Sequence, residues 1–145
     1  MSDTTATDPA ASSWTPPVFG SPCWIEIPAT NVGRAKTFYV DVFNWTFKPA
    51  TEAYPADRIA MFSVPDPKLS GLGGGIVNVG SAEHKPGSGG SVVYLWVDSI
   101  EETLAKVKNA GGSVVKEKSP EGDQGWLAKF GDTEGNVHGI YTMKT

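Results

Sequence analysis

The sequence predicts an α+β fold made of two tandem modules, each with the element order βαβββ. The spacing of apolar residues changes from every second to every third or fourth position within residues 21–43, which is typical of a strand followed by a helix. The same change recurs within residues 91–112, after a segment rich in Gly and Ser at 80–90. A strand–helix unit repeated at this distance indicates that the two halves are copies of one structural unit.

The first module covers about residues 21–80. Its first strand shows two alternating sets of side chains, Cys23, Ile25 and Ile27 against Trp24, Glu26 and Pro28. The helix that follows has its N-cap at Thr30 or Asn31, and its apolar stripe consists of Val32, Ala35, Phe38, Tyr39, Val42 and Phe43. Three further strands are predicted at residues 45–48, 58–64 and 74–79.

The second module covers about residues 91–143 and repeats this order. An apolar strand at 92–97 is followed by a capping box from Ser99 to Glu102, and the helix stripe of Ile100, Leu104 and Val107 ends at Gly111-Gly112. The last three strands are predicted at residues 113–118, 125–130 and 136–142, with a turn at 132–135.

At 145 residues, the chain has the size of one domain. We assign residues 20–145 to that domain and residues 1–19, which are rich in Ser, Thr, Ala and Pro, to a flexible N-terminal tail. The formal charge of -4 and the pI near 5.1 offer no basic surface for a phosphate backbone. Nucleic acid is therefore not an expected partner.

Cys23 is the only cysteine, so no disulfide forms within the chain, and no apolar N-terminal stretch resembles a signal peptide. The longest strongly apolar run, residues 92–97, is too short to span a bilayer. We therefore expect a cytoplasmic protein without a membrane partner.

Four stretches follow one another along the chain: WIEIPATNVGRAKTFY at 24–39, GLGGGI at 71–76, VYLWVD at 93–98 and DTEGN at 132–136. Together they resemble the glyoxalase/bleomycin-resistance/extradiol-dioxygenase group, the vicinal oxygen chelate superfamily. The resemblance covers about residues 21–143. It implies a glyoxalase-like curled mixed sheet around a central cavity with helices outside, a small-molecule ligand in that cavity, and a homodimer.

Metal-binding members of this superfamily place a His or Glu on the first and the last strand of each module. The corresponding positions in this chain hold Trp24, Gly74 or Gly75, Val92 and Gly139. None of these side chains is a usual metal ligand. The prediction is therefore a site without a metal and a protein without a cofactor; a divalent metal held at other positions is the alternative.

Alternation along the strands places one set of side chains on the cavity face. The predicted ligand-binding residues are Trp24, Glu26, Tyr94, Trp96, Val137 and Tyr141. Glu26 is the candidate catalytic acid or base, because desolvation among aromatic rings is expected to raise its pKa. The competing interpretation is a buried salt bridge from Glu26 to Arg58 or Lys129.

The two histidines and the cysteine are assigned to other places. By the same alternation His138 and Cys23 face the helix-covered core, and His138 is predicted to be packed and hydrogen-bonded there. His84 lies in the Gly- and Ser-rich segment and is expected to be exposed to solvent. With Cys23 on the core side and no G-x-S-x-G motif in the chain, nucleophilic catalysis is not expected.

Three functions remain open at the level of sequence. The first is a metal-free protein that binds or transforms a small aromatic or apolar compound in the cavity between the modules. The second is a divalent-metal-dependent lyase, isomerase or dioxygenase of the glyoxalase type. The third is a domain with only a structural or interaction role.

Overall fold

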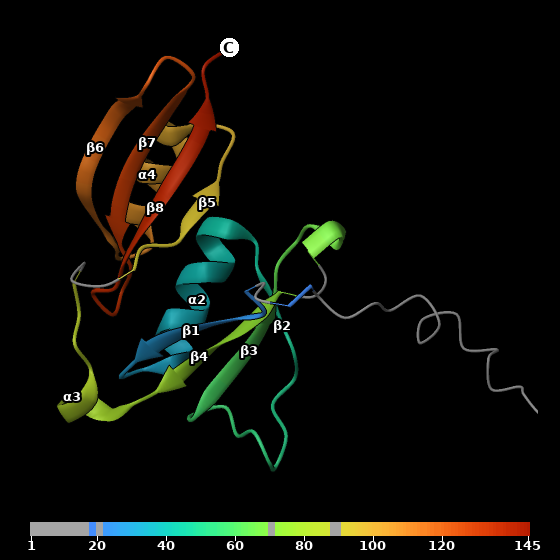
Figure 1. Ribbon diagram of the computed structural model, residues 1–145. Coiled ribbons are helices and arrows are strands. Elements are labelled where there is room, and N and C mark those ends of the chain that lie inside the picture. The colour runs from blue at the N-terminus through green and yellow to red at the C-terminus, as the bar shows by residue number, and fades with distance from the viewer. Residues whose placement is uncertain (1–17, 20–21, 70–71, 88–90) are drawn as a thin grey trace, which may run out of the picture.

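The computed structural model describes residues 18–19, 22–69, 72–87 and 91–145 (Figure 1). The predicted tail at residues 1–19 therefore lies almost wholly outside the described residues. None of the helices in the described part of the chain has the length and apolar character needed to cross a membrane.

The first module forms one four-stranded mixed sheet with the strand order β1-β4-β3-β2. Strand β1 (Trp24–Ala29) runs parallel to β4 (Gly73–Asn78), and β3 (Ile59–Ser63) runs antiparallel to β4 and to the short β2 (Thr46–Phe47). Helix α2 (Val32–Phe43) connects β1 to β2. A 3₁₀ turn (Pro67–Leu69) and the short helix α3 (Gly80–Glu83), which the sequence did not indicate, complete the module.

The second module repeats this topology with the strand order β5-β8-β7-β6. Strand β5 (Tyr94–Trp96) runs parallel to β8 (Val137–Met143), whereas β7 (Gly125–Gly131) runs antiparallel to both β8 and β6 (Ser113–Glu121). Helix α4 (Ile100–Asn109) follows β5. The predicted duplication and the α+β class are confirmed, with strand ends shifted by up to three residues.

Both long helices begin at the predicted caps. The Asn31 side chain accepts a hydrogen bond from the N–H of Arg34, and the Ser99 hydroxyl accepts one from the N–H of Glu102. Such caps pair backbone donors that the first turn of a helix leaves unbonded. Helix α2 ends at Asn44, which adopts the left-handed conformation with φ 58° and donates its N–H to carbonyls of the last turn.

Aromatic side chains of α2 connect the two modules. Tyr39 of α2 stacks on Trp45 with ring centroids 4.7 Å apart, and Trp45 stacks on Phe62 with ring centroids 4.2 Å apart. Phe38 of the same helix packs against Phe130 of β7 with ring centroids 6.0 Å apart. These side chains are buried, so one hydrophobic core is shared by both modules.

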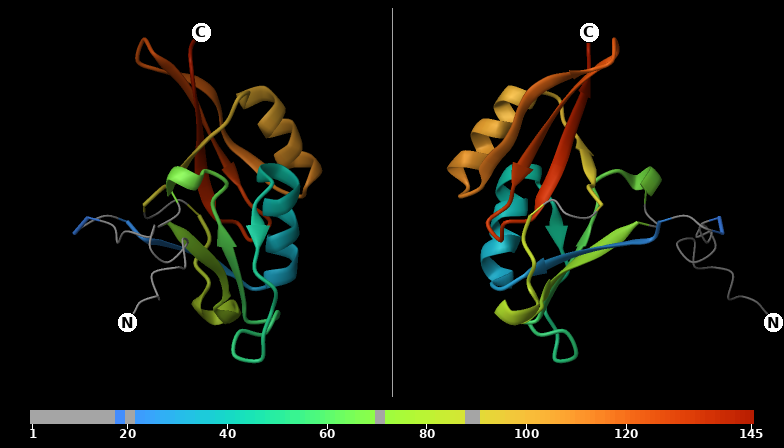
Figure 2. Two further views of the ribbon diagram at one scale, coloured as in Figure 1. Left: turned by 90° about the vertical axis from the view of Figure 1, so that its right-hand side faces the viewer. Right: turned by 60° about the vertical axis from the view of Figure 1, so that its left-hand side comes forward.

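The two long helices, α2 and α4, lie on one side of the molecule and the strands of both sheets on the other (Figure 2). Each sheet therefore has one face covered by helices and one face that the helices leave open. The two four-stranded mixed sheets agree with the glyoxalase-like fold that the resemblance implies, and the structure adds that these sheets do not close on each other. Strands β1 and β5 are edge strands of their sheets, and no hydrogen-bonded ladder joins one to the other.

A buried polar cluster in the turn between β7 and β8 fixes this arrangement. The Asp132 carboxylate accepts hydrogen bonds from the hydroxyl of Tyr39 at 2.7 Å and from the backbone N–H groups of Glu134 and Asn136. The Asn136 amide donates to the carbonyl of Pro28 at 2.8 Å. Because Tyr39 and Pro28 belong to the first module, this turn joins the second module to the first.

Glu134 extends the same connection to the beginning of α2. Its carboxylate accepts hydrogen bonds from the backbone N–H groups of Thr30 and Asn31, and from the guanidinium of Arg34 at 2.7 Å and 3.1 Å. Burial alone would raise the pKa of Glu134, but the hydrogen bonds from Arg34, Asn31, Thr30 and Thr133 outweigh it and lower the pKa from 4.5 to about 2. Glu134 is therefore ionised at neutral pH.

Tyr39→Phe removes the hydroxyl that donates to Asp132 while leaving the packed ring. Because both groups are buried, we expect the free energy of unfolding to fall by about 1–3 kcal/mol, measured by urea denaturation. Tyr54→Phe is the matched control, since Tyr54 is 49% exposed and its loss of a hydroxyl should change stability little. Equal unfolding free energies for the two variants would contradict the role given to the cluster.

Candidate functional site

The open face of the first sheet presents an aromatic ring above a glycine. Trp24 and Glu26 are exposed on β1, whereas Ile27 and Ala29 of the same strand are buried in the core. A Cβ atom placed on Gly75 of β4 would lie 3.1 Å from the indole of Trp24. The indole therefore lies over Gly75, and with 49% of Trp24 exposed its outer surface remains accessible.

The second sheet repeats this arrangement. Tyr94 of β5 pairs with Gly139 of β8, and a Cβ atom on Gly139 would lie 2.3 Å from carbons of the Tyr94 ring. Only glycine leaves room for the ring in this position. Two residues further along, Trp96 pairs with Tyr141, and their ring centroids are 6.2 Å apart. Tyr94 and Trp96 are 45% and 61% exposed.

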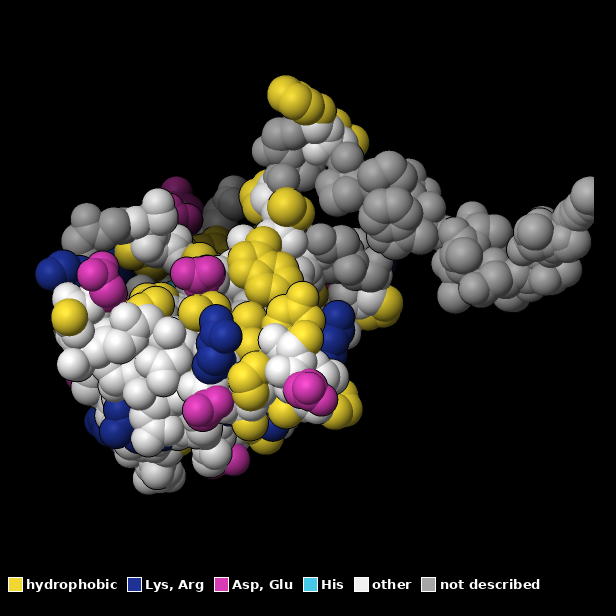
Figure 3. Space-filling view, turned by 90° about the horizontal axis from the view of Figure 1, so that it is seen from below, with side chains coloured by type: hydrophobic (Ala, Val, Ile, Leu, Met, Phe, Trp, Pro, Cys, Tyr) yellow, Lys and Arg dark blue, Asp and Glu magenta, His cyan; other side chains and the backbone are white. Residues whose placement is uncertain are grey.

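The predicted ligand-binding residues thus occupy the faces that the helices leave open, on two sheets. Trp24 and Glu26 lie on the first sheet. The other four share one face of the second sheet, because strand pairing connects them: Tyr94 pairs with Gly139, Trp96 with Tyr141, Val137 with Gly131, and Tyr141 also with Leu127. Figure 3 looks toward the first sheet from below and shows hydrophobic side chains gathered beside a few charged ones. Alternation along β1 and β5 predicts these faces correctly, although a local pattern cannot place the two sheets relative to each other.

Glu26 is exposed in the single chain. The desolvation assumed in the sequence analysis is therefore not supplied by the chain's own residues. Among the described residues, Glu26 forms no ion pair with Arg58 or Lys129, because the two ion pairs found there are Arg34–Glu134 and Lys118–Glu101. The salt-bridge interpretation is not realised within one chain.

The residues at the four positions where superfamily members hold a metal do not fit such a centre. The open-face positions carry the indole of Trp24 and the glycines Gly75 and Gly139, while Val92 precedes β5 and has no donor atom. Gly74 is turned to the core, where a Cβ atom would meet the ring of Phe62. Within the described ranges, His, Cys, Asp and Glu form no group of three or more that would hold a metal ion.

His138 faces the core as predicted. Its ring packs against Phe130 and Tyr39, with centroids 5.8 Å and 6.2 Å away, and burial lowers its pKa, partly offset by the nearby Asp132 carboxylate. Its Nε2 is buried without a hydrogen-bond partner in the described structure, so the expected hydrogen bond is missing at that atom. The side chain is therefore unsuited to reach a ligand on the open face.

His84 and Cys23 do not lie in the surroundings expected for them. His84 is half-buried and not solvent-exposed, because its Nε2 forms a hydrogen bond with the carbonyl of Glu134. Cys23 is exposed and does not face the core, because β1 begins one residue later at Trp24. Alternation fails for Cys23 because a residue outside the strand has no fixed face.

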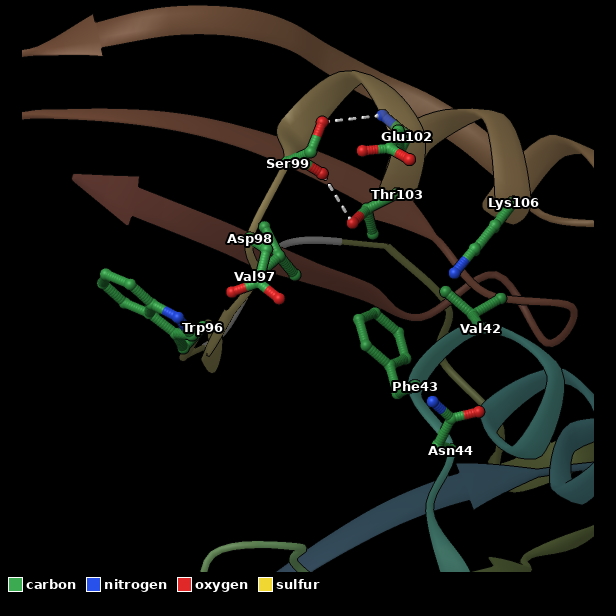
Figure 4. Close-up of a pocket in the computed structure, with 10 residues that line it drawn as sticks. All are labelled: Val42, Phe43, Asn44, Trp96, Val97, Asp98, Ser99, Glu102, Thr103 and Lys106. Atoms are coloured by element: carbon green, nitrogen blue, oxygen red, sulfur yellow. Dashed lines mark hydrogen bonds between the residues drawn. The ribbon is translucent and has the colours of Figure 1, made fainter. Parts of the chain in front are cut away.

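A pocket of about 320 Å³ lies between the end of α2 and the beginning of α4 (Figure 4), and Trp96 of the predicted ligand-binding set is among its lining residues. Phe43 and the cap Asn44 line it at the end of α2, and the cap Ser99 with Glu102 and Lys106 line it at the beginning of α4. Its rim is charged and its volume is near the lower limit for small-molecule sites. Ser99 and Thr103 are already used in capping and helix hydrogen bonds, which leaves them little capacity for a ligand.

Comparison with known proteins identifies the family. Residues 23–138 match the model of the Glyoxalase/Bleomycin resistance protein/Dioxygenase superfamily, so this chain belongs to that superfamily. A glyoxylase-like domain-containing protein from Didymella fabae is 37% identical over 120 residues, covering 81% of this chain and 90% of that protein.

Solved structures share the fold at low sequence identity. A glyoxalase-related enzyme from Fulvimarina pelagi is 13% identical with a TM-score of 0.66, covering 88% of this chain and 99% of that one. The fosfomycin resistance protein FosX from Listeria monocytogenes, solved with Mn(II) and 1S,2S-dihydroxypropylphosphonic acid, is 14% identical with a TM-score of 0.63, covering 86% of this chain and 90% of that one. At such identities the likeness supports the fold alone.

Proposed function

We propose that this protein binds, and with Glu26 transforms, a small flat aromatic or apolar compound on the open sheet faces. The observation that carries the proposal is the arrangement found in both modules, an aromatic ring laid over a glycine of the neighbouring strand. The glycine holds the ring close to the sheet, and the outer surface of the ring is left for a ligand. Offset stacking on such a ring is a favourable contact for a flat apolar molecule.

Exposure of the rings supports a binding role over a purely structural one. Trp24, Tyr94 and Trp96 are each close to half exposed or more in the single chain. Large apolar side chains exposed on the open faces of both sheets are uncommon on a protein surface that has no ligand or partner. A domain with only a structural role would be expected to bury these rings, as this chain buries Phe38, Phe62 and Phe130.

The proposed chemistry does not involve a metal at the superfamily positions. The donor atoms required there are replaced by an indole, a valine and glycines, so a divalent-metal lyase, isomerase or dioxygenase would need ligands from other positions. The Mn(II) bound in the FosX structure is a property of FosX. Among the described residues of this chain, His, Cys, Asp and Glu form no group of three or more that could hold a metal ion. Glu26 is the acid or base that the open face offers for proton transfer.

The protein is also proposed to form a homodimer in the cytoplasm. Edge strands with exposed aromatic residues are unfavourable in an isolated chain, and β1 and β5 are both edges that carry such residues. A partner that covers them would also supply the desolvation that Glu26 lacks in the single chain. Light scattering at micromolar concentration should give the mass of two chains; the mass of a single 15.4 kDa chain would contradict this.

Trp24→Ala tests the aromatic site. The probe is N-phenyl-1-naphthylamine, a neutral flat compound whose fluorescence rises in apolar surroundings. We expect its affinity to fall by about three- to tenfold, as for the loss of one stacking contact. His138→Ala is the control on the opposite face of β8, and it should lower stability without changing probe affinity. Unchanged probe affinity in Trp24→Ala, or a loss confined to His138→Ala, would reverse the assignment of faces.

Glu26→Gln separates catalysis from binding. The substitution keeps the shape of the side chain and removes its ability to exchange a proton, so affinity for the neutral probe should stay within about twofold. With a compound that the protein turns over, the rate should fall by about 10²–10⁴-fold, as for the loss of a general acid or base. Full turnover by Glu26→Gln would show that Glu26 is not the catalyst and would leave binding alone.

A further inference from the structure

The open face of the second sheet carries two lysines in line with Tyr94. Tyr94 pairs with Gly139, Gly139 pairs with Lys129, and Lys129 pairs with Lys116 on the edge strand β6. These four residues therefore form one row across the sheet. Because the ring of Tyr94 lies over Gly139, it extends along the row toward Lys129.

Burial of its neighbours places Lys129 on the open face, and strand pairing places Lys116 beside it. Along β7, Ala128 and Phe130 are fully buried in the core, so Lys129 between them points to the opposite face, where it is half-buried. Lys116 is exposed and pairs directly with Lys129, between two irregularities in β6, one after Val114 and one before Ser119. Paired residues of neighbouring strands share a face, and their Cβ atoms are about 4.5–5.5 Å apart.

This pair of like charges has no compensation within the described chain. Directly opposed lysines on neighbouring strands repel each other, yet neither makes an ion pair with a described residue. By contrast, Lys118 of the same strand β6 pairs with Glu101 of α4 at 2.8 Å. The chain is acidic, with a formal charge of -4, so two adjacent uncompensated lysines do not follow from its composition.

We infer that the ligand of this site is an aromatic anion, a compound whose flat ring stacks on Tyr94 and whose carboxylate, sulfonate or phosphate group is held by Lys129 and Lys116. The inference rests on the proposed function, because it names the chemical class of the ligand for the same open face. An anionic group would relieve the repulsion between the two ammonium groups and form charge-assisted hydrogen bonds with them. The lysines then determine specificity and take no part in proton transfer.

Two probes with the same ring system test the inference. The anionic probe is 8-anilinonaphthalene-1-sulfonate, and its neutral counterpart is N-phenyl-1-naphthylamine, which lacks the sulfonate. Fluorescence titrations of the full chain compare the wild type with the double variant Lys116→Gln, Lys129→Gln. The double variant Lys85→Gln, Lys108→Gln is the control, since it removes the same charge from exposed lysines outside the strands of the two sheets.

We expect the Lys116/Lys129 variant to bind the sulfonate about tenfold more weakly, roughly the combined effect of two exposed charge pairs, with affinity for the neutral probe changed by less than twofold. Salt should weaken sulfonate binding by the wild type more than by this variant. The control variant should behave like the wild type. If both double variants bound the sulfonate equally weakly, the loss would be due to the overall charge of the protein, and the inference would be overturned.

The remaining outcomes separate this inference from the proposed function. If the neutral probe binds but the sulfonate is insensitive to the two lysines, the anion inference fails and the aromatic site stands. If neither probe binds the wild type, the aromatic site itself fails. The Lys116/Lys129 variant could also show a lower molecular mass than the wild type while the ratio of its affinities for the sulfonate and the neutral probe is unchanged. This result would mean that the lysines contact a second copy of the chain, and it would overturn the inference.

Discussion

The hydrogen bond between the hydroxyl of Tyr39 and the carboxylate of Asp132, 2.7 Å long and buried, joins the two halves of this protein. Around it, Asn136 bonds the carbonyl of Pro28, and Glu134 bonds the backbone at the beginning of α2. A buried carboxylate is tolerated only when its oxygens accept hydrogen bonds. Each hydrogen-bond donor to Asp132 is therefore needed to keep this carboxylate stable in the core. The turn 132–136 therefore sets how the second sheet sits against α2.

This constraint determines where the open faces lie. Because α2 packs on both its own sheet and Phe130 of β7, the helix-covered sides of the two sheets share one core, and the other sides remain free. The rings of Trp24 and Tyr94 lie on these free sides, each over a glycine. The polar cluster thus stabilises the fold on one side of the sheets and leaves the proposed site, with Glu26 and Lys129, on the other.

The sequence was sufficient for the parts of this structure that depend on local pattern. Alternation gave the faces of β1 and β5, and capping residues gave the beginnings of both long helices. The partners of Asp132 and Glu134 were not predictable, because Tyr39 and Thr30 lie 93 and 104 residues away. Lys116 was missed because the irregularities in β6 change the alternation. The separation into two sheets was missed because the absence of pairing between β1 and β5 leaves no local trace in the sequence.

The central claim is that a flat ligand stacks on the aromatic residues of the open faces, at positions where other superfamily members hold a metal. The most direct test is a crystal structure of the protein with N-phenyl-1-naphthylamine. The account predicts difference density for the rings against Trp24 or Tyr94, with no cation beside Gly75 or Gly139. Density in the pocket between α2 and α4 with the open faces empty, or a cation held at those glycines, would contradict it.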